Sequence, residues 1–313
     1  MFRHMWNWLR QQPDSVSRPH NWARWVGRNW AHWTYATRIE PHWLELNHHT
    51  VPIRDLAPAF RGLRVVQMSD FHAGHHVTSA FLHEAVDLTH AQKPEVIVLT
   101  GDFIHKGYQH VERVAKDLSR LRAPMGVFAV LGNHDFSVRN ALGMRRYRDL
   151  HQAVADSLTQ HGIRLLRNET HPLERDGQKL YLTGIDDLWS RMMDLDRSFS
   201  GLCPNTPRVV LAHNPMTIEM LNGRRCDLML SGHTHGGQVK LPGIGRVALG
   251  PKGRRFAAGM YKVGDSALYV NKGVGCGLRI RYGVRPEVAV MTLAPSAPEM
   301  PSANESTKPQ ANA

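Results

Sequence analysis

The sequence predicts an α/β fold whose parallel or mixed sheet is covered by other elements on its faces. Two observations lead to this prediction. Between residues 50 and 293, short apolar segments alternate with segments of helical periodicity. Several of the apolar segments are also followed directly by glycine or by a residue of a type that binds metals. Strands that alternate with helices form βαβ units with buried strands. A length of 313 residues, with 42% hydrophobic and 21% charged residues, suits one folded domain with a large core.

The predicted elements follow one another in a regular order. The first is a strand at 63–68, and it precedes a helix at 78–92 that Thr78 or Ser79 caps. After these, the apolar pattern predicts a strand at 95–99, a helix at 109–122, a strand at 127–131 and a long helix at 139–161. The remaining predicted strands lie at 163–167, 179–185, 208–212, 227–231, 267–271 and 287–293. No stretch reaches the roughly 18 apolar residues of a membrane-spanning helix.

Residues 1–43 are predicted to be a leader outside the domain, because their composition differs from the rest. They hold seven of the eight tryptophans, and their six arginines face only two acidic residues. Trp22, Trp25, Trp30 and Trp33 fall on one face of a helix, since they lie at i, i+3, i+8 and i+11. Such a helix suits an anionic membrane surface, and docking of the tryptophans on the protein's own core is the alternative.

The leader has neither the apolar core and cleavage site of an export signal nor a twin-arginine pair. The three cysteines, Cys203, Cys226 and Cys276, are widely spaced, which favours a reducing compartment over a disulfide framework or a cysteine metal site. We therefore expect a cytoplasmic protein, peripheral on the inner face of the membrane if the leader binds lipid. Residues 294–313 are polar and rich in Pro, Ser and Ala, and they are predicted to be a disordered tail.

Side chains that bind metals follow five of the predicted strands. They are Asp70 and His72, then Asp102, then Asn133 with His134 and Asp135 beside it, then His213, and last His233 with His235. The carboxyl ends of strands in an open α/β sheet line one crevice, so we expect these segments to converge. Mixed nitrogen and oxygen ligands suit Mn, Fe, Co or Zn better than Ca or Mg. Seven ligands exceed the needs of one ion, whereas two ions about 3.5–4 Å apart that share the Asp102 carboxylate would use them all.

Five motifs resemble those of the calcineurin-like metallophosphoesterases. They are Asp70-Phe71-His72, Gly101-Asp102, Gly132-Asn133-His134-Asp135, Ala212-His213-Asn214 and Gly232-His233-Thr234-His235. The resemblance covers about 62–293 and implies a four-layer α/β/β/α sandwich of two mixed sheets, with a dinuclear metal site between the sheets. It implies one ion held by Asp70, His72, Asp102 and His235. It implies a second ion held by Asp102, Asn133, His213 and His233. By the same resemblance His134 donates a proton or hydrogen bond to the leaving group, and Asp135 orients it.

Other stretches are similar to a narrower branch of bacterial phosphodiesterases and UDP-2,3-diacylglucosamine pyrophosphatases. These stretches are 183–189, 209–215, 235–238, 269–275 and 285–288. The resemblance implies a hydrolase that cleaves a phosphodiester or pyrophosphate bond with a metal-activated hydroxide. The expected cofactor is a pair of divalent ions, Mn first, with Fe, Zn or Co as alternatives. The expected substrate is a small phosphorylated molecule, lipid-linked or a nucleotide sugar, met at the membrane surface.

Two other functions stay open at this point. A nuclease is compatible with the net charge of +12, although no nucleic-acid module is recognisable and the basic residues are not interleaved with aromatic ones. A non-catalytic membrane- or protein-binding module is the second, and the complete ligand set counts against it.

A group of basic residues comes after the last predicted ligand. They are Lys240, Arg246, Lys252, Arg254, Arg255 and Lys262, followed by Lys272, Arg279, Arg281 and Arg285. Beside a phosphoesterase centre such residues suit a diphosphate or another polyanion, and a solvated basic face is the alternative.

Overall fold

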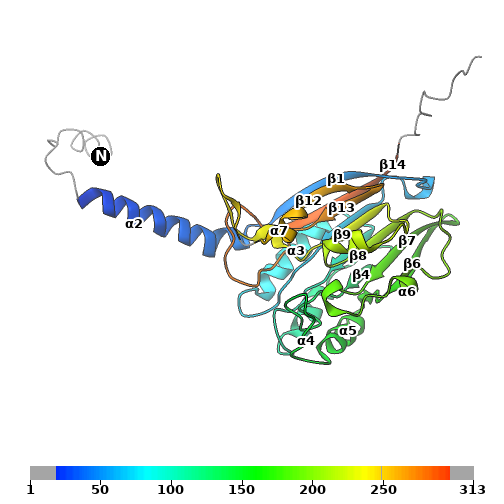
Figure 1. The fold of residues 1–313 in the computed structure, drawn as a ribbon, viewed down its shortest axis with the longest axis horizontal. Coiled ribbons are helices and arrows are strands. Elements are labelled where there is room, and N and C mark those ends of the chain that lie inside the picture. The colour runs from blue at the N-terminus through cyan, green and yellow to red at the C-terminus, as the bar shows by residue number, and fades with distance from the viewer. Residues whose placement is uncertain (1–18, 248, 297–313) are drawn as a thin grey trace, which may run out of the picture.

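Two six-stranded sheets stack face to face at the centre of the protein (Figure 1). The computed structural model describes residues 19–247 and 249–296. The first sheet has the strand order β1-β14-β2-β3-β4-β5, in which β14 runs antiparallel to β2 and every other neighbouring pair is parallel. Its strands are β1 (Glu45–Ile53), β14 (Glu287–Pro295), β2 (Arg64–Met68), β3 (Val96–Thr100), β4 (Val127–Val130) and β5 (Arg164–Leu165).

The second sheet has the strand order β12-β13-β9-β8-β7-β6. Its four inner strands are parallel, and each outer strand pairs antiparallel with its neighbour. Its strands are β12 (Gly259–Val263), β13 (Ser266–Val270), β9 (Leu228–Ser231), β8 (Arg208–Ala212), β7 (Gln178–Ile185) and β6 (Glu169–Arg175). Both sheets are mixed, as predicted.

Helices cover the outer face of each sheet and complete four layers. The first sheet carries α3 (Ser79–Ala91), α4 (Val111–Leu118) and α5 (Leu150–Gln160), and the Thr78 hydroxyl caps α3 by accepting a hydrogen bond from the Phe81 N–H. The second sheet carries the short helix α6 (Leu195–Phe199) and the 3₁₀ segment Pro215–Met220. The loop after β9 holds the hairpin of β10 (Lys240–Leu241) and β11 (Gly245–Arg246), and then α7 (Pro251–Arg255). The α/β/β/α sandwich is confirmed.

Three apolar clusters fill the three interfaces between these layers. Buried valines and leucines of both sheets, such as Val98 and Leu211, form the cluster between the sheets. Burial of each such side chain contributes about 1.5–3 kcal/mol, so the sheets are held in fixed register against each other. The ends of their central strands are therefore fixed in space as well.

The boundaries of the domain differ from the predicted 50–293. Strand β1 starts at Glu45 and β14 runs to Pro295, after which the N–H of Ser296 donates to the carbonyl of Ile53. The sequence of β1, ELNHHTVPI, is polar and contains proline, because β1 is an edge strand with one partner, β14. Edge strands β6 and β12 escaped prediction for the same reason.

The predicted helix at 139–161 is wrong in its first half, since α5 begins only at Leu150. The preceding residues form a loop that a β-bridge between Val138 and Arg145 closes. The Arg145 side chain donates to the carbonyl of Ser190, 2.7 Å away, and stacks 5.5 Å from the ring centroid of Phe136. These contacts tie the loop to both sheets and outweigh its helical periodicity.

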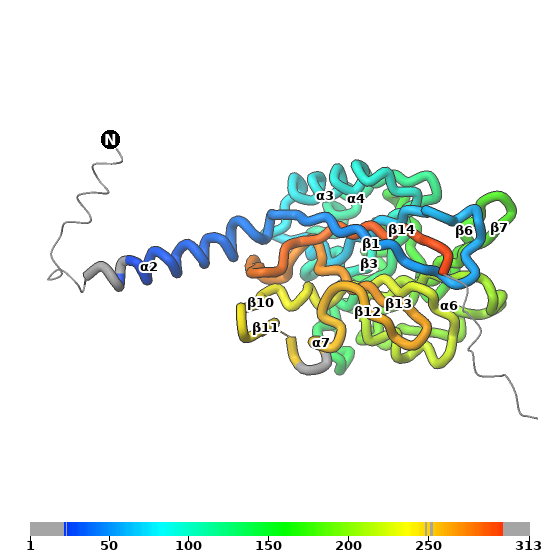
Figure 2. Tube along the Cα trace, turned by 90° about the horizontal axis from the view of Figure 1, so that it is seen from above, coloured from blue at the N-terminus to red at the C-terminus, as the bar shows by residue number. Residues whose placement is uncertain are grey.

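Helix α2 (Pro19–Thr34) protrudes from one end of the molecule, on the side of the β10–β11 hairpin (Figures 1 and 2). Its C-terminal end is attached through the segment after it. The carbonyl of Ala36 accepts from the N–H of Arg281, and the buried Glu40 carboxylate accepts from the N–H groups of Gly283 and Val284. Figure 2 shows α2 (blue) leaving the domain next to the segment before β14 (orange).

The tryptophan stripe of α2 points to solvent. Exposure is 64% at Trp22, 59% at Trp25, 69% at Trp30 and 64% at Trp33. Docking of these side chains on the protein's own core is therefore wrong. Residues 1–18 of the predicted leader and the predicted tail beyond Ser296 lie outside the described residues. Within the part of the chain that is described, no helix combines the length and the apolar character needed to cross a bilayer.

Candidate metal centre

Five strand ends bring the predicted metal ligands to one edge, between the two sheets. Asp70 and His72 follow β2, Asp102 follows β3 and Asn133 follows β4, all from the first sheet. His213 follows β8, and the pair at 233 and 235 follows β9, from the second sheet. Each sheet thus supplies part of the cluster.

Four of these side chains have their ligand atoms within 4.8 Å of one another: Asp70, His72, Asp102 and His235. The Nε2 atoms of His72 and His235 are 2.8 Å apart. The Nε2 of His235 lies 3.2 Å from Oδ1 of Asp70, and that of His72 lies 3.5 Å from Oδ2 of Asp102. Both imidazoles and both carboxylates therefore face one small volume.

The other predicted ligands form a second group that also contacts Asp102. The Nε2 of His213 is 3.2 Å from Oδ2 of Asp102, and Nδ1 of His233 is 2.8 Å from Oδ1 of Asn133. Two hydrogen bonds fix these orientations. The Asn133 amide donates to the carbonyl of Val138, 2.7 Å away, and Nδ1 of His213 bonds the carbonyl of Thr100 at 2.6 Å. Asp102 is thus the carboxylate between the two groups.

The chemistry of this donor set fits divalent metal ions. Burial lowers the pKa of His233 to about 3 and the pKa values of His72 and His235 well below the ordinary value. The neutral imidazole is the form that binds a metal. In addition, Nδ1 of His72, Nδ1 of His235 and Nε2 of His213 are buried and lack a hydrogen-bond partner among the described residues.

The two carboxylates differ in their electrostatics. Burial raises the pKa of Asp70 to about 6. Burial acts in the same direction on Asp102, but the surrounding imidazoles, His213 first, outweigh it and hold the pKa of Asp102 well below its ordinary value. A bound divalent cation stabilises both anions in addition. The site therefore keeps acceptor oxygens and the neutral imidazoles of His72, His233 and His235 together out of water, whereas Asp102 outweighs burial at His213 and raises the pKa of that imidazole well above its ordinary value.

Backbone strain is concentrated at the same residues. Five of the seven predicted ligands have positive φ: Asp70 (52°), His72 (44°), Asp102 (55°), His233 (73°) and His235 (51°). Left-handed conformations cost a non-glycine residue roughly 1–3 kcal/mol, and they persist where the surrounding structure imposes them. Here the strand ends turn sharply so that each side chain points into the cluster.

One glycine lets the second sheet approach the first closely. A Cβ at Gly232 would lie 2.0 Å from Oγ of Ser69 and 2.2 Å from Oδ2 of Asp70. The next N–H, that of His233, donates to the Asp70 carboxylate at 3.1 Å. A glycine before His233 is thus a steric requirement of the site.

Residues 63–237 match the family model described as calcineurin-like phosphoesterase. The chain belongs to this family. It is therefore a metal-dependent hydrolase of phosphoesters, and the His/Asp cluster is its candidate metal centre.

Bacterial relatives share most of the length of this phosphoesterase. It is 34% identical to the uncharacterized metallophosphoesterase YkuE of Bacillus subtilis, over 83% of this chain and 88% of the relative. It is 29% identical to the UDP-2,3-diacylglucosamine pyrophosphatase LpxG of Chlamydia trachomatis and 30% identical to the phosphodiesterase YaeI of Escherichia coli. Each of these two matches covers 83% of this chain and 92% of the relative.

His134 of the phosphoesterase lies beside the cluster, but Asp135 does not orient it. Nδ1 of His134 bonds the carbonyl of His105 at 2.8 Å, which leaves Nε2 free to face a substrate. The Asp135 carboxylate instead accepts three backbone N–H groups, from Gly132 at 2.9 Å, Phe103 at 2.9 Å and Ile104 at 3.3 Å. The orienting role predicted for Asp135 is thus corrected: it joins the strand ends after β3 and β4, and burial raises its pKa to about 8.

A cavity of about 550 Å³ opens over the cluster. Its floor includes ligand residues from both sheets, and its wall includes His134, Arg139 and Trp189. The Trp189 ring meets the His233 ring edge-on, with centroids 4.4 Å apart. Leu249 and Leu278 form an apolar part of the rim. The predicted metal ligands are therefore reachable from solvent by a substrate with both polar and apolar parts.

Sequence reasoning missed His105, Arg139 and Trp189, because none of them directly follows a predicted strand. His105 is half-buried between His134 and His72, with ring centroids 5.6 Å and 5.7 Å away, and burial lowers its pKa to about 4. The only available signal was its place three residues after Asp102, in the loop that the strand end begins.

Most members of the predicted basic group are engaged in structural contacts. The buried Arg281 donates to the carbonyls of Lys272 and Gly273. Arg246 donates to the carbonyl of Gly236, Arg254 to that of Leu249, Arg285 to that of Leu44, and Arg255 and Lys272 form ion pairs with Glu219 and Glu45. These residues hold the loops around the metal centre and do not line the cavity above it.

Proposed function

We propose that this phosphoesterase is a dinuclear phosphodiesterase or pyrophosphatase. The first ion would be held by Asp70, His72, Asp102 and His235, and the second by Asp102, Asn133, His213 and His233. The observation that carries the proposal is the placement of Asp102, whose Oδ2 lies within 3.5 Å of Nε2 of His72 and within 3.2 Å of Nε2 of His213.

When bound, the two cations supply Lewis acidity toward phosphoryl oxygens and an acidified water. The chain's own residues act on the leaving group and its surroundings. His134 faces the cavity from the side, and its Nδ1, held by the carbonyl of His105, fixes the ring so that Nε2 can donate to the departing oxygen. Trp189 and His105 line the same cavity, where they would shield that oxygen from water.

The substrate class is a small diester of phosphoric or diphosphoric acid, either lipid-linked or a nucleotide sugar. Two of the relatives support this proposal, because one is named a phosphodiesterase and another a UDP-2,3-diacylglucosamine pyrophosphatase. The apolar rim around a polar floor favours an amphiphilic molecule. Hydrolysis rates on a panel of bis-p-nitrophenyl phosphate, UDP-sugar lipids and single-stranded DNA test this proposed substrate class. Preference for DNA over both other substrates would favour a nuclease instead.

Removal of the cations is expected to abolish hydrolysis and lower thermal stability. At metal concentrations near 100 times Kd, binding stabilises the folded state by about 2.7 kcal/mol. For a domain of this size that raises Tm by roughly 5–10 °C. The measurement is differential scanning calorimetry of chelated protein with added Mn²⁺ and, as the control, Ca²⁺, for which the nitrogen-rich site is poorly suited. An equal Tm with and without Mn²⁺ would contradict the proposed site.

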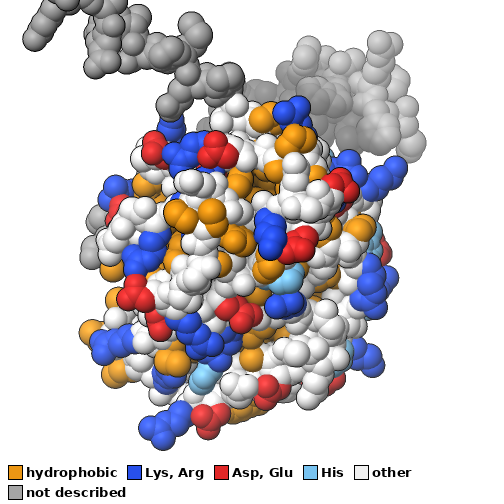
Figure 3. Space-filling view, turned by 90° about the vertical axis from the view of Figure 1, so that its right-hand side faces the viewer, with side chains coloured by type: hydrophobic (Ala, Val, Ile, Leu, Met, Phe, Trp, Pro, Cys, Tyr) orange, Lys and Arg blue, Asp and Glu red, His pale blue; other side chains and the backbone are white. Residues whose placement is uncertain are grey.

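We further propose that α2 holds the enzyme on an anionic membrane surface. The helix carries Arg24 and Arg28 on the face opposite its tryptophans and has no acidic residue. The β10–β11 hairpin, in which Ile244 is 71% exposed, lies at the same end of the molecule (Figure 2). Leu278, also 71% exposed, is attached next to this hairpin, because Nε2 of Gln238 donates to the carbonyl of Leu278. The opposite end differs, because acidic and basic side chains are interspersed over it (Figure 3). Tryptophan and arginine on opposite faces are typical of interfacial helices.

Replacing the four exposed tryptophans of α2 with glutamine in the full chain is expected to weaken binding to phosphatidylglycerol vesicles about tenfold or more. Substitution is preferable to truncation at residue 43, which would remove Glu40 and its two hydrogen bonds. Sedimentation with vesicles measures the partition coefficient, and Met220→Gln with Met260→Gln, at exposed methionines of the domain, is the matched control. Unchanged partitioning of the tryptophan variant would refute the membrane proposal.

A further inference from the structure

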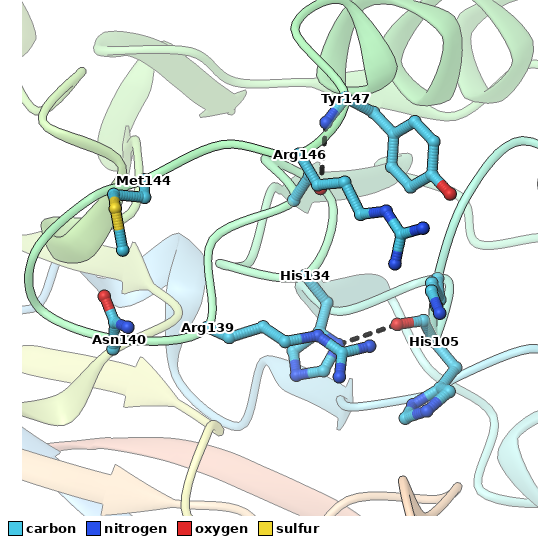
Figure 4. Close-up of a pocket in the computed structure, with 9 residues that line it drawn as sticks. His105, His134, Arg139, Asn140, Met144, Arg146 and Tyr147 are labelled. Atoms are coloured by element: carbon cyan, nitrogen blue, oxygen red, sulfur yellow. Dashed lines mark hydrogen bonds between the residues drawn. The ribbon is translucent and has the colours of Figure 1, made fainter.

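A second cavity of about 210 Å³ adjoins the metal-centre cavity and shares three residues with it, His105, His134 and Arg139. Its other walls include Lys106, Met144, Arg146 and Tyr147 (Figure 4). Figure 4 shows the side chains of Arg139 and Arg146 pointing into this cavity, on the side of His134. The catalytic candidate therefore stands at the passage between the two cavities.

The cavity is lined by cations that have no counterion among the described residues. Lys106, Arg139 and Arg146 form no ion pair and no side-chain hydrogen bond with any residue that the structure describes, and no acidic residue lines the cavity. By contrast, Arg145 of the same loop is fixed by the carbonyl of Ser190 and the ring of Phe136. Three unpaired cations around a concave surface attract an anion with several oxygens, such as a phosphate.

The loop that carries these arginines is anchored at both ends. A β-bridge joins Val138 to Arg145, and the N–H of Tyr147 donates to the hydroxyl of Ser137, 3.2 Å away. The guanidinium of Arg146 lies 5.5 Å from the centroid of the Tyr147 ring, which directs it toward the cavity. The backbone that carries both arginines is thus held in place before a ligand arrives, which lowers the entropy cost of binding.

We propose that this cavity, defined by Lys106, Arg139 and Arg146, is an anion subsite that receives the phosphate of the leaving group, so that the enzyme prefers diphosphate diesters to monophosphate diesters. The inference rests on the proposed phosphoesterase mechanism, in which His134 faces the departing oxygen. A group that leaves past His134 enters this cavity directly. A second phosphate on that group meets the three cations there, whereas an uncharged alkyl or aryl group gains nothing from them.

In this hydrolysis one bond to phosphorus forms and one breaks. The oxygen of water bonds to the phosphorus at the metal centre, and the bond from that phosphorus to the bridging oxygen breaks. The bridging oxygen departs with the second phosphorus as a phosphate monoester, and the two protons of the water pass to the products and to solvent. Since the departing group gains negative charge as the bond breaks, the two guanidinium groups stabilise it most in the transition state.

The test compares two substrates in the full chain with Mn²⁺: UDP-glucose as a diphosphate diester and bis-p-nitrophenyl phosphate as a monophosphate diester. The double variant Lys106→Gln with Arg146→Gln changes two cations that line only the second cavity, and it is expected to lose about 10- to 100-fold in kcat/KM on UDP-glucose. Its kcat/KM on bis-p-nitrophenyl phosphate should stay within about threefold of the wild type, because that leaving group carries no phosphate. Arg148→Gln, at an exposed arginine of the same loop that does not line the cavity, is the matched control.

A binding measurement separates this proposal from the proposed function. Metal-free protein is titrated with UMP, a phosphate monoester, and with uridine as its phosphate-free counterpart. We expect UMP to bind the wild type at least about tenfold more tightly than the double variant, and uridine to bind neither. Three results would each overturn the subsite. The double variant could lose activity equally on both substrates, or the wild type could cleave bis-p-nitrophenyl phosphate but not UDP-glucose. The third result is an equal UMP affinity of the wild type and the double variant. If Mn²⁺-loaded wild type cleaves neither substrate, the proposed function fails, and the UMP affinities still decide the subsite.

Discussion

Replacing His134 with alanine is expected to lower kcat by about 10²–10⁴ and to leave metal binding intact. The substitution removes the imidazole that faces the departing oxygen, but it keeps the main-chain N–H of residue 134, which donates to Oδ1 of Asp102 at 2.8 Å. Steady-state kinetics on diesters with different leaving groups measure the effect. The loss should be larger for an alkoxide than for p-nitrophenolate, because the more basic oxygen depends more on a proton donor.

Two comparisons make this prediction decisive. His110→Ala changes a histidine that lines neither cavity, and it should keep wild-type kinetics. Wild-type activity of the His134 variant would remove the residue from the mechanism. A loss of the same size for every leaving group would leave His134 as a binding group and contradict proton donation.

The second large effect is expected from Asp102→Asn, which should lose both bound metal and hydrolysis. Mutation of a residue that only orients a metal ligand lowers metal affinity or activity by about 10- to 100-fold. Removal of a carboxylate ligand that two ions share should therefore lower metal affinity and activity by more than about 100-fold. Elemental analysis of the purified variant counts the ions, and circular dichroism confirms that it is folded. Asp187→Asn is the control, because Asp187 is also buried near His213 but accepts the N–H groups of Trp189 and Ser190. Two ions per chain in the Asp102 variant would refute the shared ligand.

The parts of the molecule that the sequence predicted well are those in which one strong pattern determines structure. Buried central strands such as β3 are uninterrupted apolar runs, and each brings its next polar residue to the same sheet edge. This is why Asp102 and His213, far apart in sequence, could be placed together before their 3.2 Å separation was known. Edge strand β1 carries no such pattern, since one of its edges has no neighbouring strand.

The contacts that escaped prediction are those made by the main chain and by loops. Nothing in the residue types indicates that the carbonyl of His105, and not the carboxylate of Asp135, holds the His134 ring. The sequence pattern of the loop with Arg139 and Arg146 predicts a helix, because its apolar residues fall at helical spacing. Its conformation depends on Arg145 and the carbonyl of Ser190, a tertiary contact across 45 residues that local sequence does not encode.

The division of the proposed ligands between two sheets has a consequence for the lifetime of the protein in a cell. Three strand ends of one sheet and two of the other meet at the cluster, so bound ions would fasten the sheets together at that edge. Without the ions, buried imidazoles remain there whose ring nitrogens have no hydrogen-bond partner among the described residues. The edge would then open more often, and proteases cleave chains in proportion to such openings. Scarcity of the cation would thus reduce the amount of the protein as well as its turnover, and metal supply would set its abundance.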